Sequence, residues 1–162
     1  MELKKFLDKA KVIKTKNILL ALTSSILQLE ENLIEISSSE KLINQLGEVL
    51  KDIFIFIGEN KIEINNKELK DLDLDHWKDD IRTYKPVHPG MSTDVYLYSM
   101  RNALKHLLDE KDIKLIKVYS FELAIKTFLF IDFLDLSIDT ILEIKVREFT
   151  KIKVTSGGEN YG

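Results

Sequence analysis

Apolar residues recur at helical spacing over the first third of the chain and predict two consecutive amphipathic helices. From about residue 16 to 36 the spacing of three or four residues lays one stripe along a helix: Ile18, Leu22, Ile26, Leu29, Leu33 and Ile36. A second stripe follows, with the members Leu42, Leu46, Val49, Ile53 and Phe56. Amphipathic helices joined by so few residues are expected to pack as an antiparallel pair.

Both ends of the second helix carry recognisable signals. Ser37-Ser38-Ser39-Glu40 resembles a capping box, in which Ser37 accepts a hydrogen bond from a free amide and Glu40 reaches back. Gly58 suits the left-handed conformation that commonly follows a helix end. We therefore expect the helix to stop at Gly58.

The helical pattern breaks over residues 59–91. Lys61-Ile62-Glu63-Ile64 followed by Asn65-Asn66 is compatible with a small hairpin, or equally with a loop leading into a short helix. Trp77 and Ile81 are expected to pin this segment to the rest of the protein. Pro86 and Pro89-Gly90 end any helix there.

Three more helices are predicted beyond residue 91. The third runs to about Asp109 from a cap at Ser92 or Thr93, and the fourth covers Val118 to Leu136 and is apolar on most sides, as a central helix is. A fifth starts at Ile138 with Ser137 as its cap. Two alternating pairs near the end, Ile144/Val146 and Ile152/Val154, leave helix and strand open over residues 144–154. The third helix has the core stripe Leu97, Met100, Leu104 and Leu107.

These elements make an all-α protein, a bundle of four or five helices with a possible short hairpin within residues 59–70. A chain of 162 residues with 44% hydrophobic residues is large enough for one domain with its own core. We expect that domain over residues 1–154, followed by a flexible polar tail, 155–162.

Composition narrows the class further. The chain has no cysteine, which removes disulfides, thiolate zinc sites and cysteine nucleophiles. A net charge of −3 argues against a broadly basic nucleic-acid coat. No signal peptide opens the sequence and no apolar run is long enough for a bilayer, so a soluble, cytoplasmic protein without a membrane partner is expected. Runs of charge at residues 4–16, 71–80 and 145–153 are typical of solvated faces.

One face of the predicted third helix gathers side chains suited to a phosphodiester. At about 100° per residue, Arg101 and His106 lie about 140° apart, and Tyr98, Asn102 and Lys105 fall between them, away from the core stripe. Arginine offers a forked donor to phosphate oxygens, and histidine moves protons near neutral pH. Tyrosine can stack on a base.

Arg101-Asn102-Ala103-Leu104-Lys105-His106 resembles the Arg-x4-6-His motif of the HEPN superfamily (higher eukaryotes and prokaryotes nucleotide-binding domain). Asn102 is the polar residue favoured directly after the arginine, whereas Leu107 stands where many members have a small residue. The resemblance implies a small helical bundle and a metal-independent endoribonuclease in a toxin–antitoxin, abortive-infection or antiviral defence system.

By that resemblance Arg101 and His106 are catalytic, Asn102 helps to position them, and Tyr98 and Lys105 contact RNA. The implied reaction is attack of the ribose 2′-hydroxyl on the adjacent phosphate. It leaves a cyclic phosphate and a 5′-hydroxyl and requires no cofactor or metal. Two subunits pair about a two-fold axis so that both motifs line one cleft. The implied partners are therefore RNA, a second copy of the chain and an antitoxin or other regulatory protein.

Alternatives come from other features. The alternative function for the polar face of the third helix is a non-catalytic interaction module that binds a partner protein or a nucleotide. Arg82 to His88 is a second Arg-x5-His match, in a proline-bearing segment, and is interpreted as accidental. Asp71 to His76 spaces carboxylates like the start of a calcium loop, but His76 stands where that loop requires glycine. We interpret the stretch as a solvated acidic loop.

Overall fold

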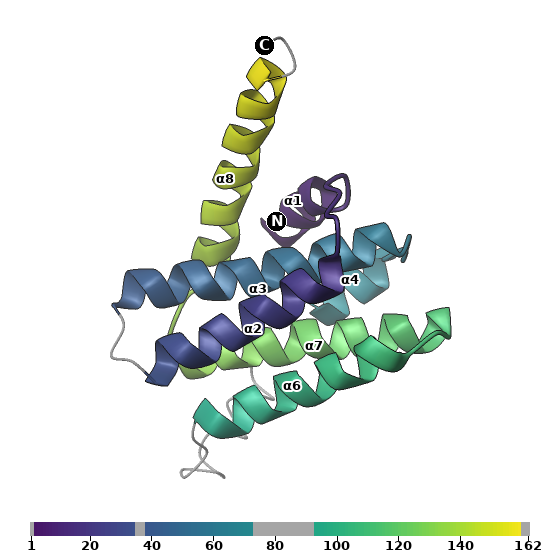
Figure 1. Cartoon of the computed structure of the whole chain (residues 1–162), viewed down its shortest axis with the longest axis vertical. Coiled ribbons are helices and arrows are strands. Elements are labelled where there is room, and N and C mark those ends of the chain that lie inside the picture. Colours follow the sequence, from purple (N-terminus) through teal and green to yellow (C-terminus); the bar gives the residue numbers. More distant parts are fainter. Residues whose placement is uncertain (1, 35–37, 73–92, 160–162) are drawn as a thin grey trace.

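The computed structural model describes residues 2–34, 38–72 and 93–159, and these residues form helices and turns without any strand (Figure 1). The all-α prediction is therefore confirmed for the described part of the chain. None of its helices combines the length and apolarity needed to cross a membrane.

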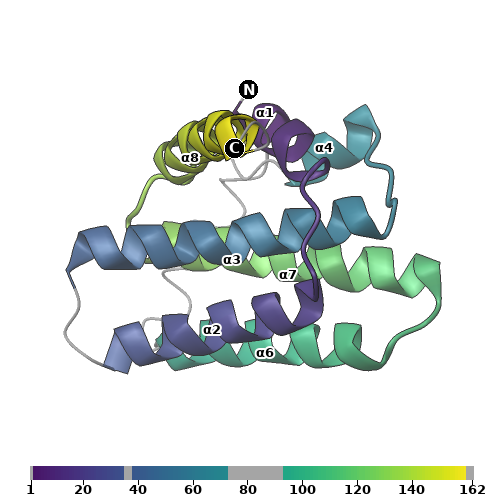
Figure 2. The same cartoon turned by 45° about the horizontal axis from the view of Figure 1, so that its top comes forward.

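Four long helices make the centre of the molecule. They are α2 (Ile18–Ile34), α3 (Ser39–Glu59), α6 (Thr93–Asp109) and α7 (Ile113–Phe133). α2 packs on α3, α6 packs on α7, and α3 and α7 pack on each other, so α2 and α6 form an outer layer (Figure 2). The six consecutive residues 52–57 of α3 are all buried, which makes α3 the most enclosed helix.

α1 (Glu2–Ala10) and α8 (Ile138–Glu159) form a second layer on the opposite side of α3 from α2 (Figure 2). Phe6 of α1 lies between Phe54 of α3, with ring centroids 5.4 Å apart, and Phe149 of α8, at 5.5 Å. The sequence did not predict α1, because its lysines hide an apolar face of only three buried residues: Leu3, Phe6 and Ala10.

The segment after α3 forms a loop and then a short helix, α4 (Asn66–Leu72), so the hairpin alternative is wrong and the loop-and-helix alternative is confirmed. Asn65 and Glu68 cap α4 reciprocally. The Glu68 amide donates to Asn65 Oδ1 at 2.8 Å, and the Asn65 amide donates to Glu68 Oε1 at 3.2 Å. This is the capping-box arrangement, here with asparagine in the first position.

The ends of α3 differ from the prediction. Ser38 is its N-cap and accepts from the Lys41 amide at 3.3 Å, whereas Ser37 lies outside the described residues. Gly58 does not adopt the left-handed conformation, and the residue that does is Lys61, with φ of 54°. Gly58 instead permits a close approach, since an added Cβ would lie 2.5 Å from Lys11 Cα.

The last two helices also correct the expected boundaries. α7 begins five residues before Val118, at Ile113, because Asp112 caps it by accepting from the Lys114 amide at 2.9 Å. α8 covers residues 144–154 and so settles the choice between helix and strand there in favour of helix. Ser137 accepts from the Thr140 amide at 3.2 Å, as expected of its cap, and α8 extends to Glu159.

Candidate functional site

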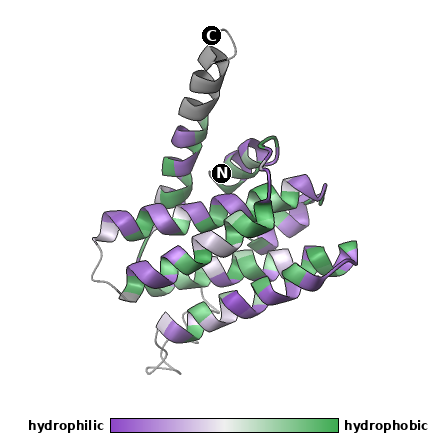
Figure 3. Ribbon diagram, in the orientation of Figure 1, coloured by the Kyte–Doolittle hydropathy of each residue, from purple (hydrophilic) through white to green (hydrophobic). Residues whose placement is uncertain are grey.

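Helix α6 lies in the outer layer, with its core face packed against α7 and an edge against α2. Leu97, Met100, Leu104 and Leu107, the predicted core stripe, are buried, together with Ala103. Because this stripe is buried, the opposite side of α6 faces solvent, and we call that side the exposed arc. Figure 3 shows that α6 is largely hydrophilic there.

All five residues singled out on this helix lie on the exposed arc. Tyr98 is the most open aromatic side chain among the described residues, with 67% of its surface exposed. Arg101, Asn102, Lys105 and His106 are exposed as well. The arc therefore presents an aromatic ring, an amide and three groups capable of carrying positive charge to the surroundings.

Arg101 lies at the α2 edge of the arc. Its Nε is 3.2 Å from Oε1 of Glu30, a residue of α2. That oxygen is fully enclosed yet has no hydrogen bond within the described part of the chain, so the contact is an ion pair without hydrogen-bond alignment. The Arg101 side chain keeps 53% of its surface exposed, so it stays accessible from solvent despite this contact.

His106 lies at the other edge of the arc, beside α7. Its ring stacks on Tyr119, with centroids 4.8 Å apart and planes 14° apart. Arg101 and His106 are thus directed toward different neighbouring helices, and about 7.5 Å of helix rise separates them. Within one chain they do not converge on a single phosphate oxygen.

A second polar cluster, which the sequence did not reveal, joins α3 to α8 around the buried side chain of Lys145. The side chain of Lys145 is only 1% exposed, and its Nζ donates to three oxygens: Asn44 Oδ1 at 3.0 Å, Glu48 Oε1 at 2.7 Å and Glu148 Oε2 at 2.9 Å. An ammonium group has three protons, and each has an acceptor here. The cluster therefore has no donor left for a substrate and acts as a structural anchor of α8.

Two carboxyl groups near this anchor have shifted pKa values of opposite sign. Burial raises the pKa of Asp52 above its ordinary value, and the 2.5 Å hydrogen bond from Ser25 Oγ only partly offsets it. Burial also acts to raise the pKa of Glu48, but hydrogen bonds from Lys145 and Lys51 outweigh it, so the pKa of Glu48 is lowered. Gln45 closes the group by donating from Nε2 to the Ser25 carbonyl at 2.9 Å.

The partners that sequence analysis missed carry only weak signals along the chain. Glu30 and Tyr119 sit beside apolar stripe positions, and nothing local says which helix each will face. Asp52 and Lys145 are stronger cases, because both interrupt apolar stripes, Asp52 beside Ile53 and Lys145 between Leu142 and Phe149. A charged residue inside such a stripe indicates a buried polar contact.

Several sequence candidates fall outside the described residues. These are Trp77 and Ile81, the second match Arg82 to His88, and most of the acidic stretch that begins at Asp71. Within the described ranges no group of three or more histidine, aspartate or glutamate side chains is arranged to hold a metal ion.

Comparison with known proteins returns no similarity on which a family can be assigned: no family model, curated protein or solved structure matches the chain.

Proposed function

We propose that this chain is a metal-independent endoribonuclease of HEPN type, acting as a toxin or a phage-defence effector. The observation that carries the proposal is the exposed arc of α6, on which Tyr98, Arg101, Asn102, Lys105 and His106 all face outward. The six-residue resemblance at Arg101–His106 supplies the reaction class.

The chemistry assigned to these side chains is proton transfer and charge stabilisation. His106 takes the proton of a ribose 2′-hydroxyl, whose oxygen attacks the adjacent phosphorus. The bond from phosphorus to the 5′-oxygen breaks, and that oxygen receives a proton, which leaves a 2′,3′-cyclic phosphate and a 5′-hydroxyl. Arg101 binds the phosphate oxygens on which negative charge accumulates, and Asn102 holds the phosphate in place.

The divergence of Arg101 and His106 supports a site built by two copies. A two-fold axis that passes midway between the two residues would place Arg101 of one copy opposite His106 of the other, since an isologous interface pairs each residue with its counterpart reciprocally. Exposed apolar side chains on the same outer layer favour contact between copies: Leu20 and Leu27 on α2, and Tyr98 and Leu108 on α6.

A second candidate function is a non-catalytic module that binds a partner protein or a nucleotide through the same arc. The contacts of Arg101 with Glu30 and of His106 with Tyr119 favour it, since both residues already have partners in the isolated chain. The net charge of −3 points the same way, because RNA binding requires positive potential.

Cleavage of single-stranded RNA in EDTA distinguishes the two functions. The proposal expects cyclic-phosphate products from the wild-type chain and their loss in Arg101→Ala and His106→Ala. Arg147→Ala is the matched control, because Arg147 is exposed on α8 and pairs with Glu143 at 2.6 Å. It changes the same charge far from α6 and is expected to cleave like the wild type.

The oligomeric state provides a second, independent measurement. Sedimentation equilibrium is expected to give the mass of a dimer. A mixture of Arg101→Ala and His106→Ala chains is expected to recover activity. A mixed dimer keeps one complete site, formed by Arg101 of the His106→Ala chain and His106 of the Arg101→Ala chain. A monomeric mass at all concentrations contradicts the composite site. A dimer that cleaves no RNA, with or without cell extract to supply an activator, favours the non-catalytic module.

A further inference from the structure

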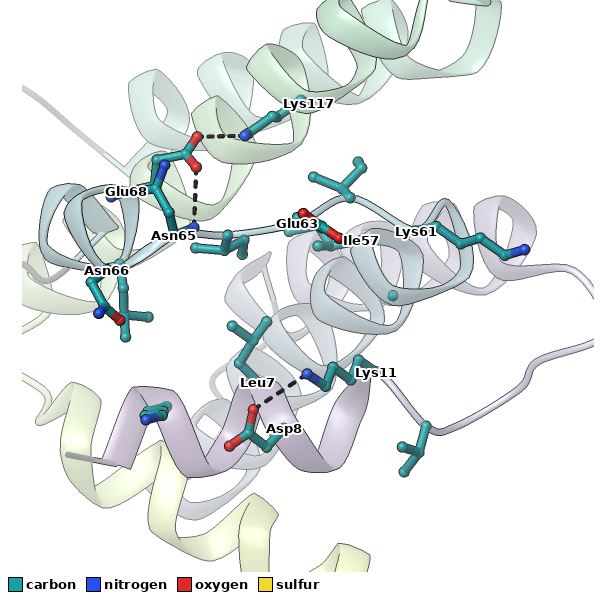
Figure 4. A pocket seen from close by; sticks show the side chains of 16 residues that line it. Leu7, Asp8, Lys11, Ile57, Lys61, Glu63, Asn65, Asn66, Glu68 and Lys117 are labelled. Atoms are coloured by element: carbon teal, nitrogen blue, oxygen red, sulfur yellow. Dashed lines mark hydrogen bonds and ion pairs between the residues drawn. The ribbon is translucent and has the colours of Figure 1, made fainter.

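A groove lies between α1, the loop after α3, α4 and the start of α7, on the side of the molecule away from the outer α2–α6 layer (Figures 2 and 4). Its volume is about 770 Å³. The apolar part of its lining consists of Leu7, Val12, Ile57, Ile62, Ile64 and Leu69. Val12 is 72% exposed, so the groove opens directly onto an apolar surface side chain.

One wall of the groove is the non-helical segment 62–64 (Figure 4). Ile62 and Ile64 are half-buried and Glu63 is exposed, which is the alternation of a strand with one face on a core. The sequence pattern left a hairpin strand and a loop open at this place, and the structure gives the segment no partner strand within the described residues. The segment therefore has the side-chain arrangement of a strand without the pairing.

Hydrogen bonds hold both ends of this segment. The Ile62 amide donates to the Ile57 carbonyl at 3.1 Å, and the Asn65 amide is engaged by Glu68. Between them the amides of Glu63 and Ile64 have no hydrogen-bond acceptor in the part of the chain that the structure describes. Unpaired amides on a fixed extended segment are a template for an added strand.

The charges around the groove favour an acidic occupant. Lys11 is paired with Asp8 at 3.6 Å and Lys117 with Glu68 at 2.5 Å, as the dashed lines in Figure 4 show. Lys4 and Lys61 also line the groove, and no ion pair to either exists among the described residues. The only acidic lining residue left to oppose these two lysines is Glu63.

We propose that this groove binds an extended acidic segment of a partner protein, which adds a strand along residues 62–64. Alternate apolar side chains of that segment enter the groove, and its carboxylates face Lys4 and Lys61. Successive amides of a strand point to opposite edges, so the added strand uses alternate residues of 62–64. A drug-sized ligand is a poorer fit, because small-molecule sites converge several polar groups on one point.

Fluorescence anisotropy with labelled peptides tests the proposal. The probes are pooled peptides of about seven residues, long enough at about 3.3 Å per residue to pass both ends of 62–64. They carry Asp or Glu at odd positions and Val, Ile, Leu or Phe at even positions. A second pool has Lys in place of every acidic residue, and a third has N-methylated backbone amides at alternate positions.

The acidic pool is expected to bind, and the lysine and N-methylated pools to bind about tenfold more weakly or worse, a factor worth about 1.4 kcal/mol. The double variant Lys4→Glu/Lys61→Glu is expected to lose acidic-pool binding by at least the same factor. Lys14→Glu is the control, since Lys14 is exposed and does not line the groove. Unchanged melting temperatures establish that each variant is folded.

Hydrogen exchange gives a local readout. Binding is expected to protect selectively one of these two amides, that of Glu63 or that of Ile64, because they point to opposite edges of the segment. If the N-methylated pool binds as tightly as the acidic pool, strand addition is overturned. If Lys4→Glu/Lys61→Glu binds the acidic pool as tightly as the control Lys14→Glu does, the role of charge is overturned. A titration to about 1 mM protein detects even weak binding, with Kd values in the millimolar range. If no pool binds at that concentration, the site is not a peptide groove. Protection of these amides by self-association alone assigns the groove to a second copy instead.

Discussion

The two polar clusters of this molecule differ in how completely their groups are satisfied. Around Lys145 the ammonium group is 1% exposed and has three oxygen acceptors within 3.0 Å. On α6 the side chain of Arg101 is 53% exposed and has one carboxylate oxygen at 3.2 Å. The first cluster joins α8 to α3, and the second leaves most of its donors open to the surroundings.

This difference separates structural from functional charge on physical grounds. A buried charge is tolerated only when its hydrogen-bonding capacity is filled, and removing it leaves its partners without that donor. An exposed charge contributes little to folding because water screens it. Variants of the buried cluster should therefore change stability, and variants of the α6 arc should change binding or catalysis while stability is retained.

The largest effect is expected from Lys145→Met. Methionine keeps the apolar stem, but Glu48, Glu148 and Asn44 lose their common donor. The free energy of unfolding should fall by about 2 kcal/mol, less than for a fully buried pair because the side chains of Glu48 and Glu148 are 31% and 41% exposed. Urea denaturation followed by circular dichroism measures it. Arg147→Met, two residues further along α8 and in an exposed pair, should change it by less than about 0.5 kcal/mol. If Lys145→Met and Arg147→Met lowered the free energy of unfolding equally, the proposed difference between a buried and an exposed cation would be contradicted.

Gly47→Ala probes how tightly the anchor is packed. An added Cβ would collide with Cε of Lys145, whose Nζ is fixed by its three acceptors. We expect a loss of about 1 to 2 kcal/mol, although helix propensity alone predicts a gain of about 1 kcal/mol. In a Lys145→Ala background the collision is absent and the same substitution should stabilise. The two-by-two set of unfolding free energies measures this reversal, and an additive result contradicts it.

The pH dependence of stability distinguishes the two shifted carboxyl groups. With its raised pKa, native Asp52 holds its proton to higher pH than the unfolded chain does. Stability therefore falls as pH rises from the ordinary value of 3.8 through the raised pKa. Asp52→Asn removes that fall, so the stability of the variant relative to the wild type should increase as pH rises. Urea midpoints between acidic and neutral pH measure the difference.

Glu48→Gln should behave with the opposite sign. The lowered pKa of Glu48 gives stability that is present above its ordinary value of 4.5 and is lost as pH falls through the lowered value. The glutamine variant should therefore lose stability at neutral pH and approach the wild type in acid. Parallel pH profiles for Asp52→Asn and Glu48→Gln would contradict the assignment of burial to one and of hydrogen bonding to the other.

The sequence predicts those parts of the fold that local periodicity controls. The stripes beginning at Ile18, Leu42 and Leu97 became α2, α3 and α6, because a continuous apolar face identifies a helix without knowledge of its partner. α1 was missed since its three buried residues contact helices from distant parts of the chain. The start of α7 was misplaced because the Asp112 cap, rather than the apolar pattern, sets where that helix begins. The start of α3 was misplaced by one residue because its cap is Ser38 and not Ser37.

The candidate site follows the same rule. Helix geometry alone places Tyr98, Arg101, Asn102, Lys105 and His106 on one arc. The contacts with Glu30 and Tyr119 depend on which helices flank α6, and no periodicity within α6 contains that information. The Lys145 cluster joins residues 97 and 101 positions apart in the sequence, so only the packing of α8 against α3 reveals which side chains Lys145 contacts.

The smallest effect is expected for the pair Glu30–Arg101. Since the guanidinium is half exposed and the contact lacks hydrogen-bond alignment, the coupling energy in a double-mutant cycle of Glu30→Gln and Arg101→Gln should be about 0.5 kcal/mol or less. Glu31→Gln, at a neighbouring exposed position on α2, is the control and should show no coupling to Arg101. A coupling as large as the effect of Lys145→Met would make Arg101 a structural residue. It would place the α6 arc in the same class as the buried cluster, which the exposure of its side chains argues against.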